Sequence, residues 1–219
     1  MEALSSWFTY VSANIDYIWE STLAHARISL IAVALATVFS ITLGVIVQRR
    51  PLARTIVLTA AGILLTIPSL ALFALFIPVF GIGNTPAIAA LYLYAILPIL
   101  RNTVTGLDSV SPAVVESARG MGLSTWQQLV KVRLPLAWPV IMTGIRVATL
   151  LTVGITAIAV LVGGDGLGTY VQSALTRNGL PNATEQLYVG VVFTVALGLV
   201  LDLVLAVVQR FTTAKGLRL

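Results

Sequence analysis

Residues 116–135 read Glu-Ser-Ala-Arg-Gly-Met-Gly-Leu-Ser-Thr-Trp-Gln-Gln-Leu-Val-Lys-Val-Arg-Leu-Pro and form a polar stretch between long apolar runs. An acidic residue and two small residues open the stretch, a glycine follows after three residues, and a leucine–proline pair closes it. The marker positions are Glu116, Ser117, Ala118, Gly122, Leu134 and Pro135. In so apolar a chain, we expect this stretch to protrude into water as a docking element.

Local signals predict a first short helix in this stretch. Ser111 is a favourable N-cap and Pro112 suits the first helical position, so we expect a helix over 112–121. Gly122 stands where a helix C-terminus favours a residue that is free to take positive φ.

A second short helix is expected over 125–132. Ser124 and Gln127 have the spacing of a capping box. Leu134-Pro135 should end this helix, because the residue before a proline is pushed out of the helical region. The alternative is an ordinary interhelical loop that happens to contain a glutamate and a glycine.

Composition places the chain in a membrane. Of its 219 residues, 58% are hydrophobic and 10% are charged, and the mean hydropathy is +0.99. Soluble domains carry about 25% charged residues. The chain has no cysteine, which excludes disulfides, cysteine-based metal sites and thiol nucleophiles. These values predict an all-α membrane protein with several spans.

Segments long and apolar enough to cross about 30 Å of hydrocarbon can be read along the chain. They are 28–47, 56–80, 87–105, 136–162 and 187–208. These five expected spans form a single transmembrane domain, 22–212, interrupted by a loop over 106–135 that contains the polar stretch. An odd number of spans places the two termini on opposite sides of the membrane.

The basic residues indicate the orientation of the chain. One side would carry Arg49, Arg50, Arg54, Arg101, Arg119, Lys131, Arg133, Arg210, Lys215 and Arg218, and the other side only Arg27 and Arg177. Because positive charge accumulates on the cytoplasmic side, the N-terminus should lie outside, and the loop and the C-terminus should lie in the cytoplasm. This distribution explains the net charge of +5 without nucleic acid.

The two ends of the chain carry smaller expectations. Residues 1–21 place Trp7, Val11, Ile15 and Ile18 at helical spacing among polar residues, which predicts an amphipathic helix on the outer membrane surface. A disordered lead-in is the alternative, and a signal peptide is not indicated. Residues 213–219 are expected to form a cytoplasmic tail.

The polar stretch resembles the EAA loop of ATP-binding-cassette (ABC) importer permeases, EAA-x3-G-x9-I-x-LP. Ser117 stands in place of an alanine, and Val132 in place of the isoleucine. In that family the loop docks on an ATPase subunit. The resemblance therefore implies the type I ABC importer permease architecture, and it implies that the marker positions couple the chain to an ATPase.

Further stretches resemble permeases for osmoprotectants such as glycine betaine, carnitine and choline. They are residues 66–72, 77–83, 93–103 and 134–146. This resemblance implies import of a small quaternary amine by alternating access. Permeases for methionine or sulfonates share the fold and remain an alternative substrate class.

The resemblance also implies partners and a location. They are a cytoplasmic ATPase dimer that holds ATP and Mg²⁺, a second permease subunit in a homodimer or heterodimer, and an extracytoplasmic substrate-binding protein. The chain itself would be a multi-pass protein of the bacterial plasma (inner) membrane. An ion-coupled secondary transporter, for which only Asp202 offers a mid-membrane carboxylate, and a non-transport scaffold are the other classes considered.

No enzyme chemistry is indicated in the chain. It has no Gly-x4-Gly-Lys-Ser/Thr phosphate loop, and the glycines of residues 163–168 do not fit a nucleotide-binding pattern. We expect these glycines to form a tight turn at the outer mouth, followed by a short helix over 169–175. The single histidine, His25, has no ligand set and is expected to be an interfacial residue. No catalytic, cofactor or metal site is expected.

Polar residues inside spans are costly, so they are candidates to line a translocation path. These candidates are Thr66, Pro68, Ser69, Tyr94 and Asn102. Pro68 frees a backbone carbonyl within the membrane, which a neighbouring threonine or serine could satisfy. The alternative is a kinked packing helix without any contact to substrate.

Arg146 and Asp202 are the two ionised residues buried in spans. Each lies eight residues from the cytoplasmic end of its span, which is a depth of about 12 Å at 1.5 Å per residue. Opposite charges at one depth are expected to pair, because each alone is expensive in hydrocarbon. The alternative is that Arg146 extends to the inner interface and Asp202 is satisfied locally.

Overall fold

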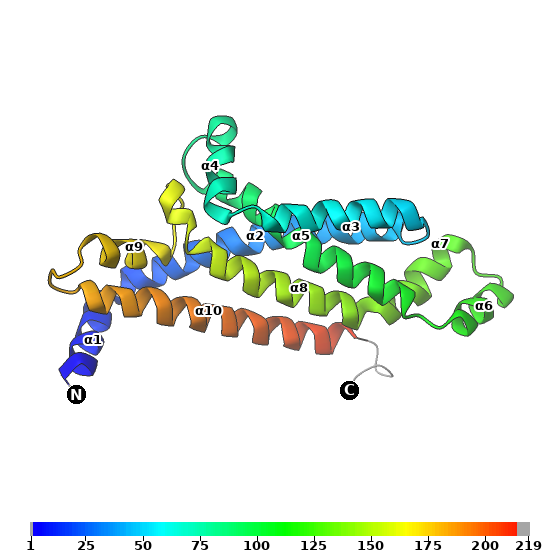
Figure 1. The fold of residues 1–219 in the computed structure, drawn as a ribbon. Helices are drawn as coiled ribbons and strands as arrows, with labels where there is room; N and C mark the ends of the chain where they lie inside the picture. Colours follow the sequence, from blue (N-terminus) through cyan, green and yellow to red (C-terminus); the bar gives the residue numbers. More distant parts are fainter. Residues whose placement is uncertain (1, 214–219) are drawn as a thin grey trace.

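The computed structural model describes residues 2–213, and within them the chain is helical and has no β-strand. Its long helices run side by side along one axis (Figure 1), and they are α2 (Ile15–Val47), α3 (Pro51–Thr66), α5 (Asn84–Asp108), α8 (Leu134–Thr156) and α10 (Ala183–Thr212). The shorter elements are α1 (Glu2–Ala13), α4 (Ser69–Phe80), α6 (Pro112–Gly120), α7 (Thr125–Gln128), η1 (Leu129–Arg133), η2 (Ala159–Val162) and α9 (Gly168–Thr176). The predicted all-α membrane fold is confirmed.

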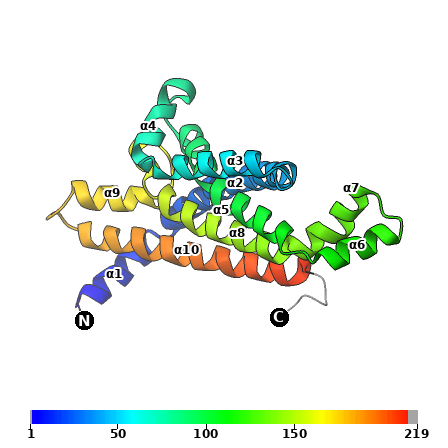
Figure 2. The same ribbon diagram turned by 45° about the vertical axis from the view of Figure 1, so that its right-hand side comes forward.

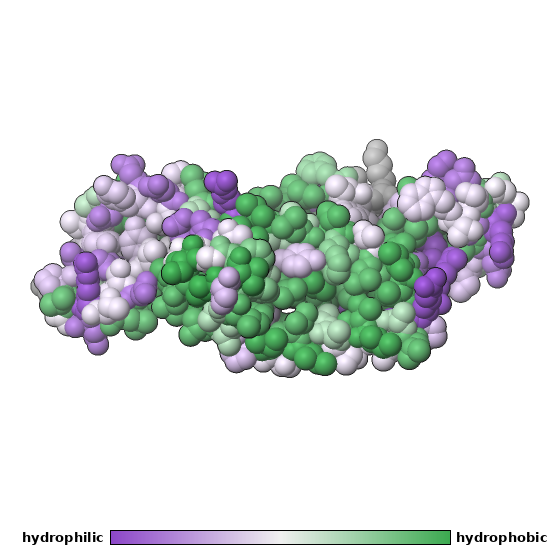
Figure 3. Space-filling model, turned by 90° about the horizontal axis from the view of Figure 1, so that it is seen from above, coloured by the Kyte–Doolittle hydropathy of each residue, from purple (hydrophilic) through white to green (hydrophobic). Residues whose placement is uncertain are grey.

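The bundle has two polar ends and an apolar middle. Figure 3 shows a broad hydrophobic belt between hydrophilic surfaces at the two ends. One end, which we call the arginine-rich end, carries α6 and α7 and the basic residues Arg49, Arg50, Arg54, Arg119 and Arg133. The other, the glycine-rich end, carries α9 and the turn over residues 163–168. This distribution fits a bundle that crosses a bilayer along its long axis.

The core is built around α5, which packs against α2 on one side and α8 on the other. Buried residues such as Ile99, Leu100 and Ile141 fill the space between these helices. Gly144 allows the close crossing of α5 and α8, because a Cβ atom there would lie 2.6 Å from the Cβ of Asn102 and 2.7 Å from the carbonyl oxygen of Pro98. Small residues at crossings of this kind are typical of membrane helices.

Several expected spans are parts of longer helices. The segment 28–47 lies within α2, 87–105 within α5, and 187–208 within α10. The fourth span differs at its end, because α8 stops at Thr156 and the chain continues as the 3₁₀ turn η2. These helices extend past the apolar segments into polar residues. They can do so because a helix forms its backbone hydrogen bonds within itself, in water as well as in lipid.

The expected outer-surface helix over 1–21 is not a single helix. α1 ends at Ala13, the chain bends at Asn14, and residues 15–21 already belong to α2. The Asn14 side chain donates to the carbonyl of Tyr10, which supports the bend. Ile18, expected on the membrane surface, is fully buried. Of the expected tail 213–219, residues 214–219 lie outside the described residues.

The segment 56–80 is not one straight span either. α3 and α4 meet at an angle of 98°, and α4 projects sideways from the bundle in both ribbon views (Figures 1 and 2). Pro68 causes the break, because it has no backbone N–H and forces Ile67 into an extended conformation with ψ 129°. By length and composition, the described residues 2–213 therefore contain four helices able to cross a membrane, or five if the bent pair counts as one span.

Candidate coupling site and translocation path

Helices α6 and α7 form a hairpin that projects from the arginine-rich end of the bundle (Figure 2). α6 ends in a Schellman motif, in which the Leu123 N–H donates to the Ala118 carbonyl and the Gly122 N–H to the Arg119 carbonyl. Gly122 takes φ +83°, and a Cβ atom there would meet no other atom within 4 Å. The glycine is therefore required by the backbone turn and not by crowding.

The second arm of the hairpin starts with a complete capping box. The Gln127 N–H donates to the Ser124 hydroxyl, and the Gln127 side chain accepts from the Ser124 N–H. These reciprocal bonds fix the start of α7 immediately after the Gly122 turn. The hairpin is therefore an ordered structure with defined caps.

The prediction that Leu134-Pro135 ends this second helix is wrong. The chain stays helical from Thr125 to Thr156, so α7 continues through η1 into α8. η1 is a π-helical turn, in which the Leu134 N–H donates to the carbonyl of Leu129 five residues earlier. This wider turn accommodates Pro135, which lacks an N–H and would distort regular α-helical hydrogen bonding. The hairpin is thereby joined rigidly to a long bundle helix.

The hairpin presents both charge and apolar surface to solvent. Glu116 lines a hollow of about 230 Å³ between the two arms, together with Arg49, Val115, Arg119, Thr125 and Gln128. At the tip, the side chains of Met121 and Trp126 are 73% and 70% exposed. Among the described residues, Glu116 has no ion-pair partner within the chain. Large apolar side chains exposed at a polar end indicate a surface for another protein.

Among the marker positions, Ala118 has a packing role. It is only 1% exposed, so a larger side chain at this position would disturb the packing of α6. The Ser117 hydroxyl donates to the Ala113 carbonyl within its own helix. Sequence analysis did not single out Arg133, whose nearly buried guanidinium donates to the Gln48 side chain and to the Leu107 carbonyl. In the sequence, this arginine contributed only to the prediction of which side of the membrane the loop faces.

The candidate path residues divide into two places. Thr66, Pro68 and Ser69 lie at the break between α3 and α4, and the Tyr94 hydroxyl donates to the carbonyl of Ile67 at this break. The carbonyl that loses its helical donor to Pro68 is that of Leu64, and it accepts from the Ile67 N–H and not from a threonine or serine, because the Thr66 hydroxyl donates to the Ile63 carbonyl. Four of the five candidates therefore surround one hinge.

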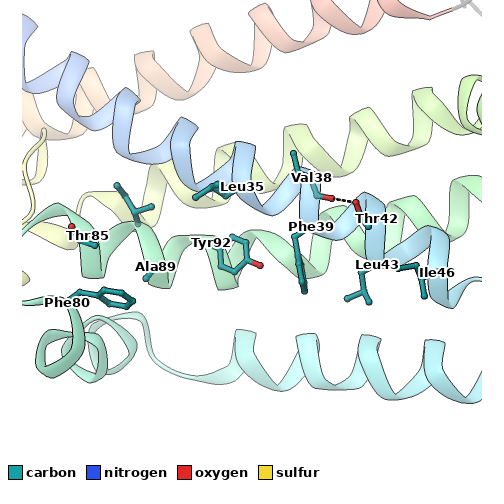
Figure 4. A pocket seen from close by; sticks show the side chains of 11 residues that line it. Leu35, Val38, Phe39, Thr42, Leu43, Ile46, Phe80, Thr85, Ala89 and Tyr92 are labelled. Carbon is teal, nitrogen blue, oxygen red and sulfur yellow. Dashed lines mark hydrogen bonds between the residues drawn. The ribbon is translucent and has the colours of Figure 1, made fainter.

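Asn102 lies apart from that hinge. Its side chain donates to the Pro98 carbonyl and packs where α5 crosses α8 at Gly144. A hollow of about 760 Å³ in the apolar belt also lies elsewhere, between α2 and α5 on the side facing α4 (Figure 4). Phe39 and Tyr92 meet edge to face in its wall, with ring centroids 5.8 Å apart. None of the candidate path residues lines this hollow.

The sequence family agrees with this architecture. A family model described as "Binding-protein-dependent transport system inner membrane component" matches residues 36–213. The chain belongs to this family. It is therefore a permease subunit of a membrane transport system, and the match covers the bent pair α3–α4, the α6–α7 hairpin and most of the bundle.

Close relatives exist along nearly the whole permease. It is 39% identical over 215 residues to the "Glycine betaine/carnitine/choline transport system permease protein OpuCB" of Bacillus subtilis, covering 98% of this chain and 97% of that protein. It is 41% identical over 214 residues to the "Osmoprotectant import permease protein OsmW" of Salmonella typhimurium, covering 95% of this chain and 98% of that one. The osmoprotectant resemblance of the sequence is confirmed.

The fold of the permease is also that of a solved importer. It matches a chain from the inward-facing MetNI methionine ABC transporter with a TM-score of 0.79, covering 92% of this chain and 99% of that one. At 22% identity, this likeness concerns the fold. The type I ABC importer permease architecture is confirmed.

Two long helices of the permease are joined by polar side chains. Arg146 on α8 and Asp202 on α10 form two hydrogen bonds of 2.7 Å each, so the structure brings the expected pair together within one chain. Nearer the arginine-rich end, the Trp138 indole N–H donates to the Thr212 hydroxyl, and the Gln209 amide donates to the Pro139 carbonyl. These contacts hold α8 and α10 in one register.

The glycine-rich end of the permease contains a residue that sequence analysis misjudged. His25 is not interfacial but fully buried. Its Nε2 lies 2.9 Å from the carbonyl oxygen of Val153, and its Nδ1 lies 3.3 Å from the backbone nitrogen of Leu167. The expected turn over 163–168 and the short helix after it, α9, are present. A lone histidine in an apolar helix was the available signal, but its contacts lie more than a hundred residues away in the sequence.

Proposed function

We propose that the chain is the membrane-spanning permease subunit of an ATP-driven importer of a small osmoprotectant, such as glycine betaine or a related quaternary amine. The relatives at 39% and 41% identity carry printed names of this substrate class and match almost end to end. The observation that carries the proposal is the hairpin of α6 and α7, here called the coupling hairpin, which projects from the arginine-rich end on a helix continuous with α8.

In this proposal the arginine-rich end faces the cytoplasm, as the positive-inside rule requires. A separate ATPase dimer, which binds ATP and Mg²⁺, docks on the hairpin through Glu116, Ser117 and the exposed Met121 and Trp126, while the buried Ala118 keeps α6 packed within the hairpin. Gly122, Leu134 and Pro135 shape the hairpin and its junction with α8. Because α7, η1 and α8 form one continuous helix, movement of the ATPase subunits is transmitted directly into the bundle.

Transport then follows alternating access. A second permease subunit, identical or related, completes the path, and a substrate-binding protein delivers the ligand at the glycine-rich end. The hinge at Pro68, held by Tyr94, gives α4 a point about which to move relative to α3. Thr66, Ser69 and Asn102 are proposed to border the path. The chain supplies binding surface and movement, and the partner subunits supply hydrolysis.

Reconstitution tests this function directly. The permease is purified with its ATPase and binding protein and inserted into liposomes, and uptake of radiolabelled glycine betaine is measured with ATP supplied on the ATPase side. We expect ligand-stimulated ATP hydrolysis and accumulation that unlabelled choline or carnitine reduces and methionine does not. Competition by methionine or a sulfonate alone would contradict the substrate class, and uptake driven by an ion gradient without ATP would contradict the mechanism.

A further inference from the structure

The turn over residues 163–168 joins several elements of the glycine-rich end. The Gly83 N–H, in the loop between α4 and α5, donates to the Val162 carbonyl just before the turn. Asn84, at the start of α5, exchanges two hydrogen bonds of 2.8 Å with Asp165, one to its carboxylate and one from its N–H. The Gly164 N–H donates to the carbonyl of Ala159, which lies just after the end of α8. Opening this end of the bundle therefore requires the turn to move.

The glycines of the turn are packed against these neighbours. A Cβ atom at Gly168 would lie 2.0 Å from the carbonyl oxygen of Ala157, which no side chain could tolerate. Gly166 takes φ +131°, and a Cβ there would lie 3.2 Å from Nδ1 of His25. The backbone of the turn thus lies directly against the imidazole ring.

His25 connects this turn to two long helices. The ring sits on α2, its Nε2 bonds to Val153 on α8, and its Nδ1 bonds to Leu167 in the turn. The Leu167 N–H is a donor, so Nδ1 must be the unprotonated acceptor, and the proton must lie on Nε2, which donates to the Val153 carbonyl. Only this neutral tautomer satisfies both contacts at once.

We propose that His25 is the positioning residue of the outer gate: its neutral imidazole holds the turn over residues 163–168 closed against α2 and α8. The inference rests on the proposed function, because it assigns the closed turn to the inward-facing half of the transport cycle. When the ring is protonated, Nδ1 becomes a donor that faces the Leu167 N–H, and the contact is lost. Acid on the outer side therefore favours release of the turn.

The other titratable groups near the His25 ring do not make the contacts that hold the turn. On α2, Arg27 is exposed; in the turn, Asp165 is engaged by Asn84; and α8 has no ionisable side chain between Arg146 and its end. On α9, burial raises the pKa of Tyr170, so its hydroxyl stays neutral from neutral to acidic pH. Among these kinds of side chain, only an imidazole has an ordinary pKa between about 5 and 8, so His25 is the group to test for a response to mild acid.

Two substitutions separate the two halves of the contact. In His25→Asn, the amide oxygen takes the place of Nδ1 and accepts from Leu167 at any pH, while the bond to Val153 is lost. In His25→Gln, the amide nitrogen takes the place of Nε2 and donates to Val153, while the acceptor for Leu167 is lost. Ser29→Ala is the matched control, because the Ser29 hydroxyl bonds to Thr156 one turn further along the same α2–α8 contact.

The experiment uses the complex with its ATPase and binding protein in liposomes, with the ATPase outside and the glycine-rich end facing the lumen. The pH of the lumen is lowered from neutral to acidic while the outer medium, which bathes the ATPase, stays neutral. Basal ATP hydrolysis without ligand and hydrogen exchange of the Leu167 amide are measured for each variant. This arrangement separates the outer gate from any effect of pH on the ATPase.

At neutral lumen pH we expect His25→Gln to raise basal hydrolysis by about fivefold, the lower end of typical coupling between sites, and to expose the Leu167 amide. Wild type and Ser29→Ala should approach this state as the lumen is acidified, whereas His25→Asn should stay low and independent of lumen pH. Should His25→Gln fail to assemble, the contrast between wild type and His25→Asn decides. Equal pH responses of those two proteins, or a protected Leu167 amide in His25→Gln, would overturn the inference. Absence of ligand-stimulated hydrolysis in wild type would instead contradict the proposed function.

Discussion

The Arg146 guanidinium and the Asp202 carboxylate form a bidentate pair that joins α8 to α10, through two hydrogen bonds of 2.7 Å. The two side chains are 32% and 24% exposed in the isolated chain, at a depth where that exposure meets hydrocarbon or another subunit. The pair therefore satisfies two charges that neither lipid nor a neighbouring backbone group could satisfy as well. Together with the Trp138–Thr212 and Gln209–Pro139 hydrogen bonds, it fixes the register of α10 against α8.

We predict that Arg146→Ala and Asp202→Ala each lower the free energy of unfolding in detergent by about 1.5–3 kcal/mol, the range for hydrogen bonds to charged groups. The double variant should lose less than the sum, because the second substitution removes a charge that is already unpaired. Thermal unfolding of the purified permease measures these values. Arg177→Ala, an exposed arginine, serves as the control, and strictly additive losses would refute the pairing.

Gly122→Val should weaken coupling to the ATPase. The positive φ of this residue costs a branched side chain about 1–2 kcal/mol, so the turn between α6 and α7 should distort although the space around it is open. We expect the permease to remain in the membrane and ATP-dependent uptake to fall several-fold. Gly120→Val is the control, since Gly120 is equally uncrowded but helical. Normal uptake by Gly122→Val would remove the turn from the coupling mechanism.

Tyr94→Phe should loosen the hinge between α3 and α4. The substitution removes the hydroxyl that satisfies the Ile67 carbonyl, at a cost of about 1–3 kcal/mol for an unsatisfied buried acceptor. We expect reduced uptake and faster hydrogen exchange around residues 67–70. Tyr92→Phe provides the comparison, because the Tyr92 hydroxyl has no hydrogen bond within the described residues, and equal effects of the two variants would argue against a hinge role.

Gly144→Ala should separate α5 from α8. A methyl group at this position would approach Asn102 to 2.6 Å, and overpacking of this kind costs about 1–3 kcal/mol. Gly154→Ala, ten residues further along the same helix, meets no atom within 4 Å and should be neutral or slightly stabilising. Melting temperatures of the two variants test this contrast, and equal temperatures would show that the crossing can relax.

The orientation of the chain can be tested with single cysteines, because the natural sequence has none. Ser124 lies in the coupling hairpin and Thr184 at the start of α10, and both are exposed. In intact cells, an impermeant thiol reagent should label Thr184→Cys and spare Ser124→Cys, and permeabilised cells should label both. Labelling of Ser124→Cys alone in intact cells would reverse the topology.

The fold class, the family and the helix–turn–helix of α6 and α7 could all be predicted from the amino-acid sequence alone. Apolar segments of span length and the asymmetric basic residues are one-dimensional signals, because a bilayer imposes its constraint on each helix separately. The Gly122 turn and the Ser124–Gln127 cap are equally local, so their residue types sufficed. The Arg146–Asp202 pair could also be predicted, because the number of residues from the end of each span gives the depth of each side chain in the membrane.

How these helices continue and where they contact one another depends on the packing of the whole bundle. Leu134-Pro135 carries a local stop signal, but packing of the bundle favours a π-turn that keeps the helix continuous. The Ile67 carbonyl at the α3–α4 break accepts from Tyr94, and His25 contacts Val153 and Leu167, all from distant parts of the chain. Such contacts depend on helix rotation and crossing, which are set by the sum of many side-chain contacts that no local pattern contains.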